Sequence, residues 1–387
     1  MTSQDKSFNE WKIPLYKIYT DDEDINLITK IVKRGTLWAI GPEIEEFEKA
    51  IKNYVGVEYC VCLNSGTSAL HAAYLAHGLK SGDEVIVPSF SFISTANSVL
   101  FVGATPVFAD IEEKTRGLDP ESITQKITPK TKAVVPMDYG GLSCQISEIS
   151  KVAKENNLTV IEDAAECLGA SVNGKKSGSL SDTAIFSFCG NKVLTTGEGG
   201  AIVTSSKEIY EKIKLIRSHG RVDKVSYFNN PLEAEYVNVG YNWRMSSITA
   251  SLGISQLGKL DKLVRMRQQH ASYLSSRLSK YKQITVPSPP PGYEHIYQMY
   301  TIMLPNEKTR NDLQEHLLNK RIFCKVYFDP IHLKPFYKQK YGTKENQLPV
   351  TEDTTRRVLT LPIYPNMTTE EKDYLVQSIA EFFDRDN

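Results

Sequence analysis

Three short stretches of the sequence place reactive side chains directly after apolar runs. Lys192 lies in FSFCGNKVLTTGEGGA, between a short apolar run and a cluster of three glycines. Glu162 and Asp163 interrupt the end of a second run, TVIEDAAECLGA, and NSGTSAL at 64–70 combines a glycine with three hydroxyl side chains. A lysine past a strand is commonly a solvated charge, so its chemistry depends on whether the other two stretches lie beside it.

NSGTSAL has the composition of an anion-binding helix start. Free N–H groups in the first turn, a glycine that permits close approach, and the hydroxyls of Ser65, Thr67 and Ser68 would together cradle a phosphate. The alternative is a plain N-cap followed by a helix. No Walker-type lysine follows, so the stretch does not indicate binding of a nucleoside triphosphate.

The acidic pair is expected to send its two side chains in opposite directions, since alternate residues of a strand point to opposite faces. One carboxylate of Glu162 and Asp163 should enter the crevice beyond the strand. Burying it unpaired costs several kcal/mol, so it requires a cation. That cation belongs either to a ligand or to a nearby Lys or Arg of the chain.

Together the three stretches suit pyridoxal phosphate. This aldehyde cofactor needs a lysine for its Schiff base, an acid beside the ring nitrogen to keep the ring an electron sink, and a cradle for its phosphate. The glycines at 197, 199 and 200 permit positive φ beside the crowded imine. VPSFSFISTANS adds Phe92 as a flat side chain that could stack on the ring; the alternative is a core phenylalanine.

The elements that must position these residues form a regular pattern. Seven apolar, β-rich runs (YCVCLNS, EVIVPS, TPVFAD, TKAVVPM, TVIEDAA, TAIFSF and GAIVTS) alternate with helical stretches such as 66–79 and 146–156. Nearly continuous apolar strands are typical of a sheet covered on both faces. We therefore expect an α/β fold with a mostly parallel seven-stranded sheet, whose carboxyl ends hold the reactive residues.

The remaining sequence predicts a second, smaller C-terminal α/β domain. One long helix is expected from Ser246 to about 280, bridging two domains divided as 1–255 and 256–387. After PSPPPG come an alternating strand, HIYQMYTIML, a helix near 307–319, and a closing helix at 369–383 with a Thr368–Glu371 capping box. The segment 218–245 has no sustained period and is longer than ordinary loops, which indicates a functional role.

Composition restricts the partners. Lys plus Arg and Asp plus Glu each total 46, so zero formal charge favours a small-molecule substrate over nucleic acid or a membrane surface. The first residues lack the apolar core of a secretory signal and no apolar run is long enough to cross a bilayer, so we expect a cytoplasmic protein. The six cysteines form no CxxC pair; we expect buried thiols, without a metal site or disulfides.

The chain resembles the DegT/DnrJ/StrS-type sugar aminotransferases over nearly its whole length. The family pattern appears in order as LWAIGPEIEEFEKAI, SGTSAL, PSFSF, IEDAAE, FSFxxxK and TGEGG. The resemblance implies a fold-type I pyridoxal phosphate enzyme. In the family's dehydratase branch a histidine replaces the Schiff-base lysine, so Lys192 argues against that branch.

The resemblance assigns roles to the cofactor residues. Lys192 would form the Schiff base and then move the proton between substrate and cofactor carbons. The ring nitrogen would be held by Asp163, with Glu166 near the phenolic oxygen and Phe92 stacked on the ring. Phosphate would be bound by the backbone of Gly66 and Thr67 and by the hydroxyl of Ser187.

Three further positions are implied by the resemblance alone. Asn242, in VGYNWRMS, would reach across a homodimer interface to the neighbouring subunit's phosphate, so that the two active sites are shared. His332, in DPIHLKPFY, would lie near the sugar, unless it is simply a surface histidine. Trp38 would line the same pocket.

The motifs FCGNK and EDAAE look most like the 4-aminotransferases that make perosamine and related sugars. This implies transfer of the amino group of L-glutamate onto a nucleotide-linked keto sugar, an NDP-4-keto-6-deoxyhexose. The alternatives are a 3-keto sugar, a cyclitol or an aromatic precursor as acceptor, or a regulatory protein of the same fold that has lost turnover.

Overall fold

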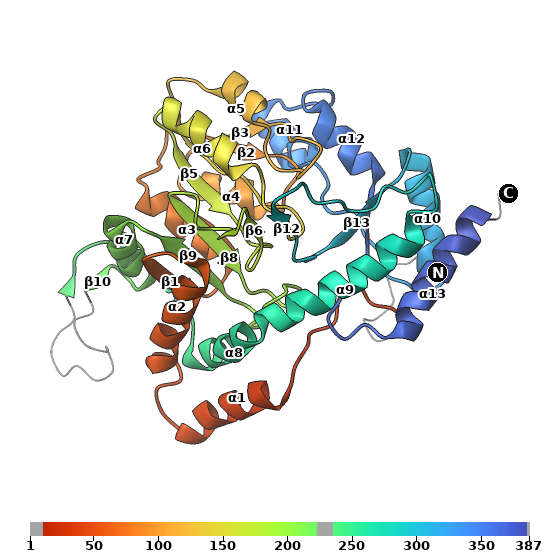
Figure 1. Ribbon diagram of the computed structural model, residues 1–387. Helices are drawn as coiled ribbons and strands as arrows, with labels where there is room; N and C mark the ends of the chain where they lie inside the picture. The colour runs from red at the N-terminus through yellow and green to blue at the C-terminus, as the bar shows by residue number, and fades with distance from the viewer. Residues whose placement is uncertain (1–10, 223–234, 385–387) are drawn as a thin grey trace.

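The computed structural model describes residues 11–222 and 235–384 (Figure 1). A seven-stranded sheet forms its centre, in the order β1-β9-β8-β5-β4-β2-β3. Its strands are β1 (Tyr59–Leu63), β2 (Glu84–Pro88), β3 (Thr105–Ala109), β4 (Thr131–Val134), β5 (Thr159–Asp163), β8 (Thr183–Ser187) and β9 (Gly200–Thr204). Neighbours from β8 to β3 are parallel, and β9 runs antiparallel to β1 and β8. The expected sheet is confirmed, strand by strand.

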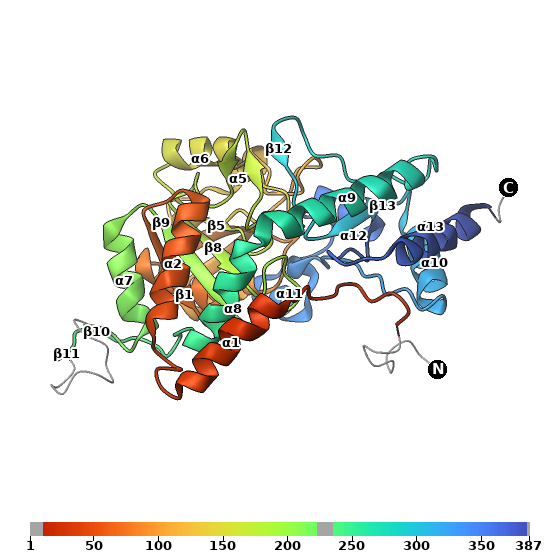
Figure 2. The ribbon, with the colours of Figure 1, turned by 60° about the horizontal axis from the view of Figure 1, so that its bottom comes forward.

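Helices cover both faces of this sheet (Figures 1 and 2). Along β1, Val61 and Leu63 pack on one side while Cys60 and Cys62 pack on the other, which explains why the strand is apolar throughout. The first side is covered by α3 (Gly66–Ala76), α4 (Ser94–Phe101) and α7 (Lys207–Arg217). The second side is covered by α2 (Pro42–Val55), α5 (Pro120–Lys126), α6 (Ile146–Glu155) and α8 (Ser247–Gly258).

The prediction of a single long helix after Ser246 is wrong. The helix is interrupted at Lys259, where α8 ends and α9 (Leu260–Leu278) begins. Lys259 leaves helical geometry, with φ −110° and ψ 5°, and its buried ammonium lies 3.0 Å from a carboxylate oxygen of Asp24 and also pairs with Asp21. Both acids belong to the start of α1 (Asp22–Arg34), so a contact distant in sequence accompanies the break.

The C-terminal part packs around its own apolar cluster. A two-stranded sheet, β13 (Tyr300–Met303) and β14 (Val358–Leu361), contacts α9, α10 (Glu307–Asn319) and α13 (Thr369–Phe383). The helices α10 and α13 have the expected bounds, and the capping box is confirmed. The expected strand HIYQMYTIML is shorter than predicted, since only 300–303 of it belongs to β13. The division at 255/256 stays a prediction.

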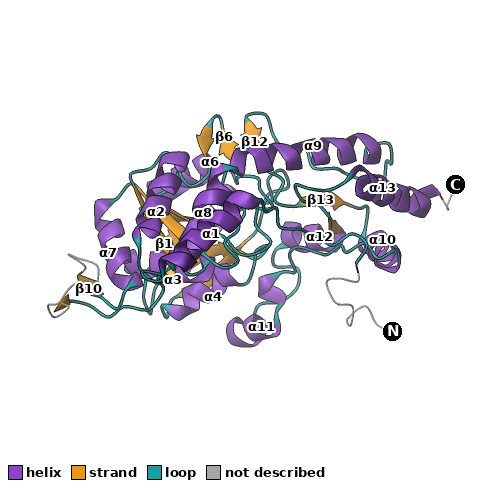
Figure 3. Ribbon diagram, turned by 90° about the horizontal axis from the view of Figure 1, so that it is seen from below, coloured by secondary structure: helices purple, strands orange, loops and turns teal. Residues whose placement is uncertain are grey.

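The α9 helix connects the sheet-bearing part to the C-terminal helices, and α7 and α13 lie at opposite ends of the molecule in every view (Figure 3). The smaller elements are β6 (Ser171–Val172), β7 (Lys175–Lys176), β10 (Arg221–Val222), β11 (Glu235–Tyr236), β12 (Tyr293–Glu294), η4 (Ile331–Leu333), α11 (Pro335–Tyr341) and α12 (Pro349–Arg357). Of the irregular segment 218–245, residues 223–234 lie outside the described part.

All six cysteines are free thiols, and five of them are buried, as expected. Among the described helices, none is both long enough and apolar enough to span a bilayer.

Candidate active site

The three reactive stretches meet at the carboxyl ends of β1, β5 and β8. The side chain of Lys192 is only 14% exposed, and its Nζ lies 3.0 Å from Oε1 of Glu166, which follows β5. Ser187 at the end of β8 touches the first residue of α3, because a methyl group added to Gly66 would lie 2.9 Å from the Ser187 Cβ. The solvated-lysine interpretation is therefore wrong.

The loop that carries Lys192 is held by its own backbone and by one distant residue. The amide of Lys192 donates to the Cys189 carbonyl at 2.9 Å. From the C-terminal part, the Gln298 side-chain amide donates to the Asn191 carbonyl at 2.7 Å. Gln298 was not identified from the sequence, since nothing local distinguishes it in an apolar, aromatic stretch. It links the lysine loop to the segment that precedes β13.

The β1–α3 turn begins a helix at the expected place, and its role as an anion site stays a prediction. The α3 helix begins at Gly66, with Ser65 as its N-cap accepting from the Ser68 amide at 3.1 Å. A Cβ on Gly200, at the start of β9, would lie 2.4 Å from the Ser65 carbonyl oxygen. Glycines at 66 and 200 thus allow the turn, β8 and β9 to approach closely, and the backbone N–H groups of Gly66 and Thr67 at the start of α3 would be the donors to an anion. The Thr67 hydroxyl is 2.8 Å from that of Ser94.

Asp163 and Glu162 point to opposite sides, as the strand alternation predicts. Asp163 is 3% exposed; its Oδ2 accepts from the Thr95 hydroxyl at 2.7 Å and its Oδ1 from the Ala165 amide at 3.3 Å. Burial raises the pKa of Asp163, because these partners and the field of Lys192 only partly replace water. A cation beside this carboxylate would lower its pKa again.

Glu162 serves the other side of the sheet. Its Oε1 accepts from the Gly178 amide at 2.9 Å and its Oε2 from the Ser181 hydroxyl at 2.7 Å. Burial, followed by the nearby Asp138, raises its pKa well above the ordinary value. The two acids therefore have different environments, and only Asp163 faces the lysine side.

Glu166 is almost fully buried and fully engaged. One carboxylate oxygen is paired with Lys192, and the other accepts from the Gly140 amide at 3.0 Å. The charge of this carboxylate is therefore balanced by the lysine itself. A bond from Gly140, in the loop after β4, fixes the orientation of the carboxylate that holds Nζ.

The phenylalanines of PSFSF have separate roles. Phe90 is fully buried beside Tyr139, whose ring centroid is 4.9 Å away, and so fills the core position that was the alternative for Phe92. Phe92 itself is 57% exposed. Between them the Ser91 hydroxyl lies 2.7 Å from that of Thr95, which holds Asp163. An exposed ring is thus attached to the segment that holds the acid, and its stacking role stays a prediction.

Trp38 and Asn242 are both exposed and lie on segments that approach α8 and α7. The Trp38 indole N–H donates to the Ile31 carbonyl at 3.0 Å, and its own carbonyl accepts from the Ser247 amide. Asn242 pairs with Ser218 through an isolated β-bridge. Their roles toward sugar and neighbouring subunit stay predictions.

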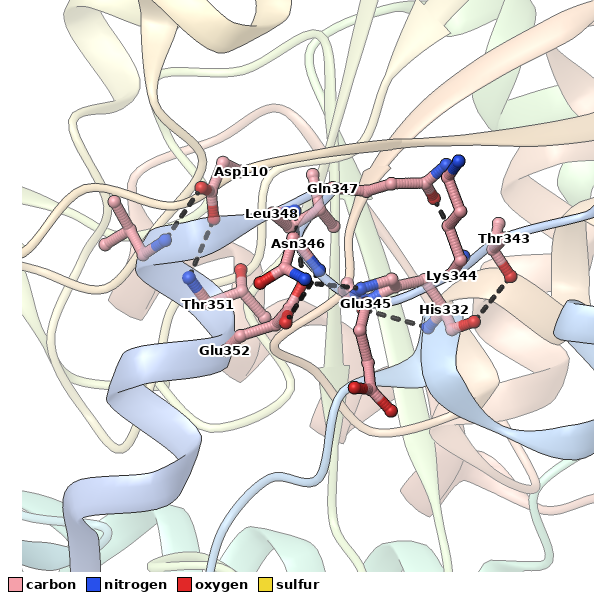
Figure 4. Close-up of polar contacts among 12 residues, drawn as sticks. Asp110, His332, Thr343, Lys344, Glu345, Asn346, Gln347, Leu348, Thr351 and Glu352 are labelled. Carbon is pink, nitrogen blue, oxygen red and sulfur yellow. Dashed lines mark hydrogen bonds and ion pairs between the residues drawn. The ribbon is translucent and has the colours of Figure 1, made fainter. Parts of the chain in front are cut away.

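The alternative that His332 is a surface histidine is wrong. Its side chain is buried, with Nδ1 2.6 Å from the Ser89 hydroxyl and Nε2 3.3 Å from Oε1 of Glu352. Figure 4 shows His332 and Glu352 among the residues of this group. The sequence places it beside prolines and lysines and carries no sign that β2 and α12 close over it. With both ring nitrogens occupied, His332 offers no group to a sugar.

Comparison with known proteins identifies the family. Residues 19–380 match the model of the DegT/DnrJ/EryC1/StrS aminotransferase family. The chain is 37% identical to GDP-perosamine synthase of Caulobacter vibrioides over 351 residues, covering 89% of this chain and 92% of that one. It is 33% identical to UDP-4-amino-4,6-dideoxy-N-acetyl-beta-L-altrosamine transaminase of Campylobacter jejuni over 372 residues, covering 94% and 96%.

A solved structure has the same fold. Helicobacter pylori PseC, an aminotransferase involved in the biosynthesis of pseudoaminic acid, superposes with a TM-score of 0.90 at 29% identity, covering 96% of this chain and 99% of that one. The expected fold-type I architecture is thereby confirmed. The chain belongs to the DegT/DnrJ/EryC1/StrS family and is a sugar aminotransferase.

Proposed function

We propose that the protein uses pyridoxal phosphate to transfer the amino group of L-glutamate to a nucleotide-linked keto sugar, an NDP-4-keto-6-deoxyhexose. The observation that carries this proposal is the convergence of a buried lysine, a buried acid and a glycine-lined helix start at one sheet edge. Each meets one requirement of the cofactor: an amine, an acid for the ring nitrogen and an anion cradle.

The residues fit the cofactor on their own chemistry. Asp163 is a buried carboxylate whose raised pKa would fall again beside a protonated ring nitrogen. Gly66, Thr67 and Ser187 would hold the phosphate, Phe92 would cover the ring, and Glu166 would approach its phenolic oxygen. When bound, the cofactor supplies an electron sink that makes the substrate's carbon–hydrogen bond acidic.

The chain's own contribution is to move protons. Lys192 is oriented by Glu166, so its Nζ is positioned rather than swinging into solvent. Once the amine is free, its Nζ would take the proton from the carbon of the amino donor and deliver it to the cofactor carbon, and it would carry out the reverse transfer with the keto acceptor, as acid and base in both half-reactions. Glu166 would stabilise the protonated amine between the two transfers.

The acceptor is proposed from the relatives. Those named above make or act in pathways of amino sugars, and two names specify GDP- or UDP-linked sugars. Incubation with L-glutamate and a panel of nucleotide-linked 4-keto and 3-keto sugars, with products identified by mass and NMR, tests this. We expect 4-amino products; exclusive conversion of 3-keto sugars or cyclitols would overturn the assignment, and no spectral change with glutamate would favour a regulatory role.

The phosphate cradle gives a specific prediction at Gly66. Alanine there would bring its Cβ to 2.9 Å from Ser187, and such overpacking costs about 1–3 kcal/mol. We expect Gly66→Ala to weaken pyridoxal phosphate binding about 10- to 100-fold, measured by fluorescence titration of the apoenzyme. Gly190→Ala is the control, since its Cβ would meet only the Gly197 carbonyl at 3.9 Å. Equal affinities of both variants would contradict the cradle.

A homodimer is proposed from an exposed apolar strip. It comprises Phe101, Tyr236, Val237, Val239 and Tyr241, which are 37–82% exposed. The ring of His71 lies 5.3 Å from both Phe101 and Tyr241, which joins α4 to the segment after β11. Asn242 adjoins the strip, so a partner seated there would receive its side chain.

Val239 is the most exposed member of the strip, at 82%. We expect Val239→Asp to raise the dimer dissociation constant about 100-fold, because burying an unpaired carboxylate costs about 3 kcal/mol. Light scattering across a dilution series measures it. Phe336→Ser on α11, which also removes an exposed apolar side chain, should leave the dimer intact. A dimer unaffected by Val239→Asp would place the interface elsewhere.

A further inference from the structure

The segment 331–352, which carries the buried His332, binds Ser89 after β2 and Asp110 after β3. Figure 4 shows Asp110 at the start of α12. Ser89 directly follows β2 and is held three times: its carbonyl accepts from the Ile331 amide at 2.9 Å, its hydroxyl accepts from the His332 amide at 2.9 Å, and that hydroxyl contacts Nδ1 at 2.6 Å. Neither Ser89 nor His332 is exposed at all. This excludes a hydrolytic Ser-His-Glu role, because no substrate reaches the hydroxyl.

The hydrogen bonds define one protonation state. The Ser89 oxygen already accepts from the His332 amide, so its hydrogen is best donated to Nδ1. Nε2 then carries the ring hydrogen and donates to Glu352 at 3.3 Å. A doubly protonated ring would donate to Ser89 from Nδ1 and leave the buried hydroxyl hydrogen without its acceptor, which is costly. Neutral His332 therefore satisfies every member of the group.

The charges around the ring come from three elements. Glu352 on α12 also accepts from the Asn346 and Leu348 amides, and Asp110 after β3 accepts from the Val350 and Thr351 amides. The positive charge of Lys338 on α11 opposes protonation of His332, whereas the negative charges of Glu352 and Asp110 favour it. The effect of burial is larger than these charge effects, so the pKa of His332 is lowered. The two carboxylates fasten the start of α12, and the imidazole fastens Ser89.

Ser89 begins the segment that supports the cofactor site. Three residues further, Phe92 presents its exposed ring, and the Ser91 hydroxyl lies 2.7 Å from Thr95, which donates to Oδ2 of Asp163. Because Thr95 gives its hydrogen to Asp163, Ser91 must donate to Thr95. A shift of Ser89 would therefore move both the ring and the bond that orients the acid.

We propose that His332 is a positioning residue for the cofactor: through Nδ1 it holds Ser89, and thereby the 89–95 segment that places Phe92 and orients Asp163. This rests on the proposed function, since Phe92 and Asp163 matter only to a bound ring. His332 itself touches neither cofactor nor sugar. The contact with Glu352 serves the docking of α12 instead.

Two substitutions separate the two contacts. His332→Asn keeps an acceptor near the Nδ1 position, facing Ser89, but does not reach Glu352; His332→Gln keeps a donor near the Nε2 position but removes the acceptor for Ser89. Ser89→Ala removes the Ser89 contact without altering the histidine. The readouts are the visible circular dichroism of the holoenzyme, kcat and KM for glutamate, and thermal stability.

We expect His332→Gln and Ser89→Ala to change the cofactor's dichroism and lower kcat about 10- to 100-fold with little change in KM. His332→Asn should lose stability but keep a dichroism and kcat close to wild type. Uniform loss of stability in all three, with unchanged spectra and kcat, would overturn the proposal in favour of a purely structural histidine. If wild-type protein neither bound pyridoxal phosphate nor reacted with glutamate, the proposed function would fail instead, independently of these variants.

Discussion

Replacement of Lys192 by alanine is expected to reduce amino transfer by at least about 10⁴-fold, because in the proposed function this one side chain would supply both the amine that binds the cofactor and the acid–base group of each half-reaction. Stopped-flow observation of the glutamate half-reaction measures the loss directly. The same change leaves Glu166, which is 5% exposed at its side chain, without its cation. A buried carboxylate without a partner is destabilising, so the loss of activity must be separated from a loss of folding.

Lys192→Arg provides that separation. Arginine preserves the positive charge beside Glu166 but does not give up its proton and does not replace the reactive amine. We expect Lys192→Arg to fold with near wild-type stability and to be as inactive as the alanine variant. Transamination that survived in either variant would remove the chemical basis of the proposed function.

Replacement of Asp163 by asparagine should lower kcat at least about 100-fold, since the ring nitrogen would lose the partner that keeps it protonated. The apoenzyme should respond in the opposite way and become more stable at neutral pH. Burial raises the pKa of Asp163, so the ionised form is disfavoured in the folded apoenzyme. Asparagine removes that charge while its amide can retain the bond from Thr95.

The pH dependence follows from the sign of this shift. A carboxyl group with a raised folded-state pKa contributes stability below its unfolded pKa, near 4, and loses it as the pH rises through the folded value. The stability advantage of Asp163→Asn in the apoenzyme should therefore be largest near neutral pH and vanish toward about pH 4. Urea denaturation of both apoproteins across this range measures it.

Glu162→Gln is the matched control for Asp163→Asn. Glu162 adjoins Asp163 on β5 but points to the other side, where Gly178 and Ser181 bind it. Its pKa is raised strongly, so glutamine resembles the protonated side chain. We expect kcat close to wild type. Equal losses in both variants would mean that neither acid has a special relation to the ring nitrogen.

The sheet and two helices could be derived from the sequence because their signals are local. In the run EVIVP every residue after Glu84 is apolar, which is sufficient to predict a strand covered on both faces. The cap of α13 is formed by residues three apart, Thr368 and Glu371, so both the start of the helix and the type of its cap could be predicted. The position of the reactive stretches at one edge of the sheet could likewise be predicted, because parallel strands all end at the same edge.

The break at Lys259 and the burial of His332 were decided by contacts between distant parts of the chain. Lys259 is bound by Asp21 and Asp24, more than two hundred residues away in the sequence, and His332 is enclosed by Ser89 and Glu352. Gln298 acquires its relation to the lysine loop in the same way.

The sequence by itself therefore determined which residues could do the chemistry and on which kind of edge they lie. The tertiary structure decided which of them meet. It pairs Lys192 with Glu166, turns Asp163 rather than Glu162 toward the lysine side, assigns Phe90 to the core and leaves Phe92 exposed. The reason is that residue type and strand period are properties of neighbours along the chain, whereas burial and pairing depend on which segments pack together, and a short sequence pattern carries no record of its distant partners.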